Sequence, residues 1–180
     1  MSRVSRTSAP SPKQIIFKTN IKREREMVWN TSFDVNDDYF TPKSAWEAIK
    51  EYIPKDKVIW EAFYGDGLSG KHLDDLGFNV IHENVDFFKS NLGDIIVSNP
   101  PFSKTKEIFT RLKEINKPFI LILPDYKIHT NYFRQMFDDG QIQILIPKKR
   151  IQFSKEGKCS FDCFYFCWKM NLKKDIIFLG

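Results

Sequence analysis

From residue 40 onward, short apolar runs alternate with segments in which apolar residues recur every three or four positions. The runs are rich in β-branched and aromatic residues and predict strands, whereas the spaced pattern predicts amphipathic helices. Strands are expected at 57–63, 78–82, 94–98, 118–123, 141–146, 150–153 and 161–168, and helices at 41–52, 69–76, 104–115 and 130–137, with a hairpin tip at 154–158. Thr41 is expected to cap the first helix, with Pro42 in its first turn. This alternation is typical of an α/β fold.

The apolar run 95–98 ends at Asn99-Pro100-Pro101-Phe102. Two consecutive prolines fix φ and lack N–H groups, so they stop the strand and stiffen the loop at its carboxyl end. The loop then presents an amide oxygen, a backbone carbonyl that no strand ladder uses, and an aromatic ring. Two acceptors and a ring suit a flat, amino-bearing group such as adenine. An ordinary strand-ending turn is the alternative.

The segment 61–67, with the sequence EAFYGDG, predicts a glycine turn between a strand and a helix. Glycines permit positive φ and a close approach of the backbone to a ligand. Open α/β sheets bind ligands in the crevice beyond the carboxyl ends of their strands. The turn lacks the third glycine of the pyrophosphate fingerprint. Glu61 suits a cationic ammonium group rather than a phosphate, and a solvated strand-end carboxylate is the alternative.

Acidic residues also follow the second predicted strand, which ends at His82 and Glu83. Glu83 stands at the distance from the glycine turn at which an acidic residue binds ribose hydroxyls. Asp86 is expected to accept a hydrogen bond from an adenine amino group while Phe87 stacks on its ring. Loop polarity for Asp86 and core packing for Phe87 are the alternatives.

The segments 39–42 (YFTP), 63–67 (FYGDG) and 99–102 (NPPF) together resemble the S-adenosylmethionine-dependent amino-methyltransferases, in particular the compact phage and viral N6-adenine enzymes. The similarity covers about residues 39–170. It implies a Rossmann-like class I methyltransferase fold, in which a mostly parallel, doubly wound sheet has an antiparallel C-terminal strand. It also implies S-adenosylmethionine as cofactor and direct in-line methyl transfer to the N6 amine of adenine.

The resemblance assigns roles to individual residues. The implied catalytic residues are Asn99, Pro100, Pro101 and Phe102, with Phe102 stacked on the target base. The implied cofactor-binding residues are Tyr39, Phe40, Thr41, Glu61, Phe63, Tyr64, Gly65, Gly67, Glu83, Asp86 and Phe87. The chain departs from the family pattern at Glu61, where aspartate is common, and in the compressed region between Glu83 and Asp86.

Length and charge add expectations about organisation. A chain of 180 residues normally forms one domain, here expected at 27–180 without a separate target-recognition domain. Residues 1–26 hold seven Lys or Arg and two Glu, so this arm carries the whole net charge of +5. Its Ser/Pro-rich beginning predicts disorder. Nucleic-acid binders and solubilising tails both have such basic arms.

The remaining charge and cysteine patterns bear on partners and compartment. Lys104, Lys148, Lys149 and Arg150 are candidate substrate contacts, with a solvated surface as the alternative. No run of 18 apolar residues and no apolar signal core are present, which predicts an intracellular protein of the cytoplasm or nucleus without a membrane span. The cysteines at 159, 163 and 167 miss the spacing of zinc sites, so buried thiols are expected and no metal site.

The expected function is therefore adenine-N6 methylation of nucleic acid, with DNA as the first expectation and RNA as the second. A protein glutamine methyltransferase is one alternative, because an amide nitrogen poses the same chemical problem. A non-catalytic, methyltransferase-like scaffold subunit is another. A protein partner that supplies target recognition is a further expectation, because no separate target-recognition domain fits in 180 residues.

Overall fold

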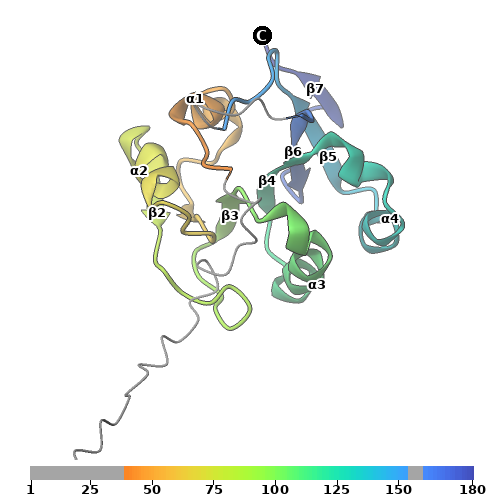
Figure 1. The fold of residues 1–180 in the computed structure, drawn as a ribbon, viewed down its shortest axis with the longest axis horizontal. Helices are drawn as coiled ribbons and strands as arrows, with labels where there is room; N and C mark the ends of the chain where they lie inside the picture. The colour runs from red at the N-terminus through yellow and green to blue at the C-terminus, as the bar shows by residue number, and fades with distance from the viewer. Residues whose placement is uncertain (1–38, 154–159) are drawn as a thin grey trace, which may run out of the picture.

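The computed structural model describes residues 39–153 and 160–180, in which a seven-stranded sheet lies between two pairs of helices (Figure 1). The strands are β1 (Val58–Trp60), β2 (Asn79–Ile81), β3 (Ile95–Ser98), β4 (Phe119–Pro124), β5 (Ile142–Ile146), β6 (Cys163–Trp168) and β7 (Ile176–Phe178). The α-helices are α1 (Lys43–Glu47), α2 (Leu68–Asp75), α3 (Thr105–Ile115) and α4 (Asn131–Phe137). Short 3-10 helices are η2 (Lys50–Tyr52), η3 (Phe102–Lys104) and η4 (Asp125–His129).

The strand order in the sheet is β2-β1-β3-β4-β6-β5-β7. β6 runs antiparallel to both β4 and β5, and the other neighbouring strands pair in parallel. The chain moves outward from β1 to β2 and then returns across β1 to β3. The strand order thus reverses between β1 and β3, and such a switch point opens a crevice at the carboxyl ends. The predicted Rossmann-like, mostly parallel sheet is confirmed, but its antiparallel strand is β6, and the C-terminal strand β7 pairs in parallel with β5.

Helices cover both faces of the sheet. α2 connects β1 to β2, and α3 connects β3 to β4 in the opposite direction along the sheet, so right-handed crossovers place these helices on opposite faces. α1 contacts α2, and α3 contacts α4. The central strands β3 and β4 are buried along their whole length, as expected for strands covered on both sides.

Three local predictions were wrong. Segment 150–153 forms no strand, because β6 already pairs with β4 on one side and β5 on the other and has no free edge. The edge strand β7, which was not predicted, pairs in parallel with β5 instead. The first helix starts at Lys43 after Pro42, so Thr41 is not its cap, and it breaks into α1 and η2.

Some expectations lie outside the described residues. These are the basic arm at 1–26, the hairpin tip at 154–158 and Cys159. Within the part of the chain that the structure describes, no helix is long and apolar enough to span a bilayer. Cys163 and Cys167 are buried free thiols in β6, and burial raises the pKa of the Cys167 thiol.

Candidate active site

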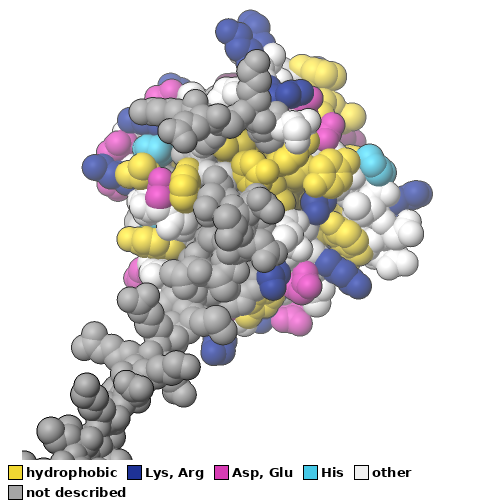
Figure 2. Space-filling view, in the orientation of Figure 1, with side chains coloured by type: hydrophobic (Ala, Val, Ile, Leu, Met, Phe, Trp, Pro, Cys, Tyr) yellow, Lys and Arg dark blue, Asp and Glu magenta, His cyan; other side chains and the backbone are white. Residues whose placement is uncertain are grey.

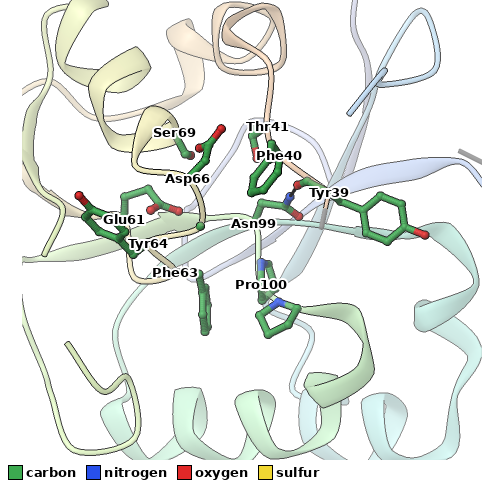
Figure 3. A pocket seen from close by; sticks show the side chains of 12 residues that line it. Tyr39, Phe40, Thr41, Glu61, Phe63, Tyr64, Asp66, Ser69, Asn99 and Pro100 are labelled. Carbon is green, nitrogen blue, oxygen red and sulfur yellow. Dashed lines mark hydrogen bonds between the residues drawn. The ribbon is translucent and has the colours of Figure 1, made fainter. Parts of the chain in front are cut away.

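The three sequence motifs meet in one pocket at the carboxyl ends of β1 and β3 (Figure 3). The pocket holds about 430 Å³ of atom-free space, part of it open to solvent. Its lining residues are Tyr39, Phe40, Thr41, Glu61, Phe63, Tyr64, Gly65, Asp66, Ser69, Asn99, Pro100 and Pro101. All of them except Asp66 and Ser69 were predicted site residues. The pocket therefore forms at the switch point of the sheet, where the topology places a ligand crevice.

Asn99 follows β3 directly, and its side-chain amide is held in one orientation. Nδ2 donates a hydrogen bond of 2.7 Å to the Tyr39 carbonyl, so the 39–42 segment anchors the start of the 99–102 motif. Oδ1 is buried and accepts no hydrogen bond within the described part of the chain. A buried acceptor without a donor is destabilising, and native structures rarely contain one without a reason. In the wall of a pocket, Oδ1 of Asn99 is an atom that a bound donor would satisfy.

The two prolines carry the chain from Asn99 into η3. Pro101 is extended, with φ −62° and ψ 125°. Among the backbone groups of the described residues, none donates to the Pro100 carbonyl. The stiff corner therefore sets a second acceptor directly after Asn99.

Phe102 packs beside the pocket instead of lining it. Its side chain is 6% exposed, and its ring stacks on Tyr39 with centroids 5.2 Å apart and planes at 26°. Phe153 and Phe161 meet the same ring edge-on. Lys127 and Thr105 donate to the Phe102 carbonyl at 3.1 and 2.7 Å and fix η3. The predicted base-stacking ring is thus part of an aromatic cluster in this structure.

The glycine turn between β1 and α2 forms as predicted. Gly67 donates its N–H to the Tyr64 carbonyl at 2.9 Å, and Asp66 accepts from the Leu68 N–H at 2.9 Å. Gly65 and Gly67 have φ of 55° and 81°, the left-handed region that other residues avoid. Gly65 lines the pocket, while Gly67 lies behind it under the Tyr64 ring.

Glu61, directly after β1, is fully buried, and each of its carboxylate oxygens lies close to a polar side chain. Ser98 Oγ donates to Oε1, and His82 Nε2 lies 2.7 Å from Oε2. Burial lowers the pKa of His82, but the contacts with Glu61, the Tyr64 backbone and Asp66 together outweigh it, so the net pKa is raised above its ordinary value. Neither Ser98 nor His82 was a predicted site residue. The only signal in the sequence was a polar residue at the end of an apolar strand.

Ser69 joins two helices under the pocket. Its Oγ accepts a hydrogen bond of 3.1 Å from the indole Nε1 of Trp46, which is fully buried in α1. Nothing in the sequence pattern pairs these positions, which are 23 residues apart. The bond ties the start of α2 to α1, and so fixes the pocket wall that follows the 39–42 segment.

Replacing Ser69 by alanine is expected to lower the free energy of unfolding by about 1–3 kcal/mol, because the buried indole N–H loses its acceptor. Urea denaturation followed by tryptophan fluorescence measures the change. Lys71→Ala, an exposed position on the same helix, is the matched control and is expected to change stability little. Equal stability of Ser69→Ala and wild type would show that the bond does not hold the two helices.

Besides Gly67, three predicted cofactor contacts do not reach the pocket. Phe87 is fully buried and packs on Trp60 and Phe63 in the core. Glu83 is exposed and absent from the lining. Asp86 accepts from the Phe88 N–H at 2.9 Å and pairs with a lysine three residues on. The structure brings together the 39–42, 61–65 and 99–101 segments but not the region after β2.

The predicted basic contacts lie along a second groove between α1, the loop after β5 and the end of the chain after β7, which holds about 850 Å³ of atom-free space, part of it open to solvent. Lys148 and Lys149 are exposed there. Arg150 forms a bidentate ion pair with Asp162, in which Nε donates to Oδ1 at 2.7 Å and Nη2 donates to Oδ2 at 3.1 Å. Lys104 is exposed at the end of η3, next to the 99–102 motif.

No family model matches the chain, and no curated protein matches it in sequence. Among solved structures, the ribosomal protein L11 methylase of Lactobacillus delbrueckii subsp. bulgaricus is 11% identical, with a TM-score of 0.46 over 69% of this chain and 76% of that one. A putative class I S-adenosylmethionine-dependent methyltransferase of Listeria monocytogenes is 12% identical, with a TM-score of 0.45 over 83% of this chain and 68% of that one. At these identities the likeness carries no information about substrate.

Proposed function

We propose that this protein is an S-adenosylmethionine-dependent methyltransferase that acts on the N6 amine of adenine in nucleic acid. The observation that carries the proposal is the buried Oδ1 of Asn99, which has no hydrogen-bond partner among the described residues and whose orientation is set by the bond from its own Nδ2 to Tyr39. The Pro100 carbonyl follows it on a stiff corner. Two neighbouring acceptors match the two N–H bonds of a planar amino group.

The pocket residues also fit the proposed cofactor. The buried carboxylate of Glu61 suits an ammonium group, and the positive φ of Gly65 lets the backbone approach a ligand closely. Phe40 and Phe63 add apolar surface on either side. When bound, S-adenosylmethionine would supply a methyl group activated by its sulfonium.

The chain's contribution to the reaction is orientation. The exocyclic amine of adenine is a poor nucleophile, because its lone pair is delocalised into the ring. Hydrogen bonds from both N–H groups to Asn99 Oδ1 and the Pro100 carbonyl favour a pyramidal nitrogen with its lone pair free to point at the methyl group. Positioning of this kind lowers the barrier by on the order of several kcal/mol. The methylated amine then loses one proton to solvent and becomes neutral again.

The surface around the pocket supports a base of a nucleic acid as the acceptor. Phe40 lies in the 39–42 segment of the pocket wall and is 41% exposed. Tyr126 lies in η4, after β4, and is 42% exposed. Exposed aromatic faces stack on bases that have left a helix. Figure 2 shows hydrophobic side chains gathered in the upper middle of one face, with Lys or Arg side chains beside them.

Transfer of a labelled methyl group from S-adenosylmethionine tests the proposal on three acceptors: unmethylated DNA, ribosomal RNA and capped RNA. Nucleoside mass spectrometry is expected to find N6-methyladenine in at least one of them. Label that enters only protein would identify a glutamine methyltransferase instead. A chain that binds no S-adenosylmethionine in calorimetry, and transfers no label, would be a scaffold subunit.

The second groove, which is lined by Lys148 and Lys149, gives a separate prediction about nucleic-acid binding. Lys148→Ala combined with Lys149→Ala is expected to weaken binding and to reduce the slope of log K against log salt by about 0.9 for each phosphate that is no longer neutralised. Fluorescence anisotropy across a salt series measures both quantities. The pair Lys173→Ala and Lys174→Ala removes the same charge from exposed positions before β7 and serves as control. Equal slopes in the two double variants would assign no phosphate binding to the groove.

A further inference from the structure

The acid in the wall of the pocket already has a basic partner. Glu61 is fully buried, and His82 Nε2 lies 2.7 Å from its Oε2 while Ser98 Oγ donates to Oε1. The ammonium group of a ligand that binds Glu61 must therefore compete with the imidazole of His82 for the same carboxylate. At a carboxylate without a basic neighbour, the ammonium group would bind without this competition.

The position of the imidazole is built by three elements. The Tyr64 ring stacks on His82 with centroids 4.7 Å apart and planes at 23°. On the α2 side, Gly70 leaves the space that the ring fills, since a Cβ there would stand 2.2 Å from His82 Cγ and Nδ1. Glycine at position 70 therefore leaves the room that His82, the residue after β2, needs to reach Glu61.

The charges that face His82 all favour its protonated form. Glu61 and Asp66 act from the turn after β1, and the Tyr64 backbone accepts a hydrogen bond. β3 contributes only the hydroxyl of Ser98 through Glu61, and α2 contributes Gly70, which has no titratable group. Burial opposes these contacts but does not outweigh them, so the pKa of His82 is raised.

We propose that His82 is a positioning residue that holds the Glu61 carboxylate with a proton, and that it releases this proton to solvent when the ammonium group of the cofactor takes over the carboxylate. This inference rests on the proposed function, since it invokes S-adenosylmethionine. Cofactor affinity should then rise with pH, by at most about tenfold per pH unit, between the pKa of His82 in the bound protein and its higher pKa in the free protein. Outside that window affinity is flat.

Isothermal titration calorimetry of the full chain with S-adenosylhomocysteine, which carries the same ammonium group, tests this. Titrations from pH 5.5 to 8.5 in two buffers of different ionisation enthalpy are expected to show net proton release in the wild type. His82→Gln should abolish the release, and His129→Gln, an exposed histidine, should keep it. Binding without proton exchange in the wild type would overturn the inference and leave the proposed function intact. Absence of binding in the wild type would overturn both.

A second measurement does not depend on a folded His82 variant. The chain has three histidines, so their imidazole nitrogens can be assigned by NMR from His72→Gln and His129→Gln alone. The resonance that remains in both variants is His82. Its pKa is expected above the ordinary histidine value in the free protein and lower with S-adenosylhomocysteine bound. An unchanged pKa on binding would contradict the proposal.

Discussion

Replacing Asn99 by alanine is expected to lower kcat for methyl transfer by about 10²–10³-fold, the usual cost of removing one preorganised polar contact to a reacting group. The variant loses the unpaired Oδ1 and also the bond from Nδ2 to the Tyr39 carbonyl. Glu61 and the glycine turn stay in place, so cofactor binding should persist. Single-turnover transfer of labelled methyl measures the first effect, and calorimetry with S-adenosylhomocysteine measures the second.

Two further variants separate the roles of the Asn99 amide. Asn91→Ala removes an exposed amide from the loop before β3 and is expected to leave kcat unchanged. Asn99→Asp keeps acceptor oxygens but sets a carboxylate against the Tyr39 carbonyl, so the side chain loses its anchor. Activity between those of Asn99→Ala and wild type would assign part of the rate to orientation by Tyr39. Wild-type kcat in Asn99→Ala would contradict the proposed mechanism.

The sequence predicted the position of the pocket well, because its signals are local. The apolar run before Asn99 is stopped by two prolines, and the run before Glu61 is followed by a glycine turn. Both strands are parallel, so their carboxyl ends meet at the same edge of the sheet. That rule alone brings Asn99 and Glu61 into one pocket without knowledge of any contact.

Residues whose role depends on tertiary packing were not predictable in the same way. The sequence position of Phe87 suggested a cofactor contact, but its ring packs in the core against Trp60 of β1 and Phe63 after β1. The ring of Phe102 likewise stacks on Tyr39 and does not line the pocket. His82 reaches Glu61 only because Gly70, on another element, leaves room. The order of residues along the chain does not show which side chains pack against each other in the folded protein.

Gly93 shows how the two site-bearing strands are held together. It precedes β3 with φ of 59°, and a Cβ there would stand 2.8 Å from the Val58 carbonyl oxygen and 3.1 Å from the Trp60 nitrogen. The next residue, Asp94, donates its N–H to the Val58 carbonyl at 2.7 Å and accepts from the Val58 N–H at 2.9 Å. The chain thus enters β3 in direct backbone contact with β1.

Gly93→Ala is therefore expected to lower the free energy of unfolding by about 3 kcal/mol or more, since the new methyl group meets backbone atoms that cannot rotate away. The strain falls between β1 and β3, so the spacing of Glu61 and Asn99 should change as well. Urea denaturation measures the loss of stability. Calorimetry with S-adenosylhomocysteine under native conditions measures the effect on the pocket.

Gly77→Ala and Gly140→Ala separate this steric effect from the cost of backbone conformation. Both glycines have positive φ, of 87° and 69°, and a Cβ at either would meet nothing within 4 Å. Each variant is expected to lose only the roughly 1–2 kcal/mol of a left-handed residue with a side chain. The excess loss in Gly93→Ala then reports the close approach of β1 and β3. If all three variants lose the same stability, backbone conformation alone explains Gly93, and close approach does not set the spacing of the two strands.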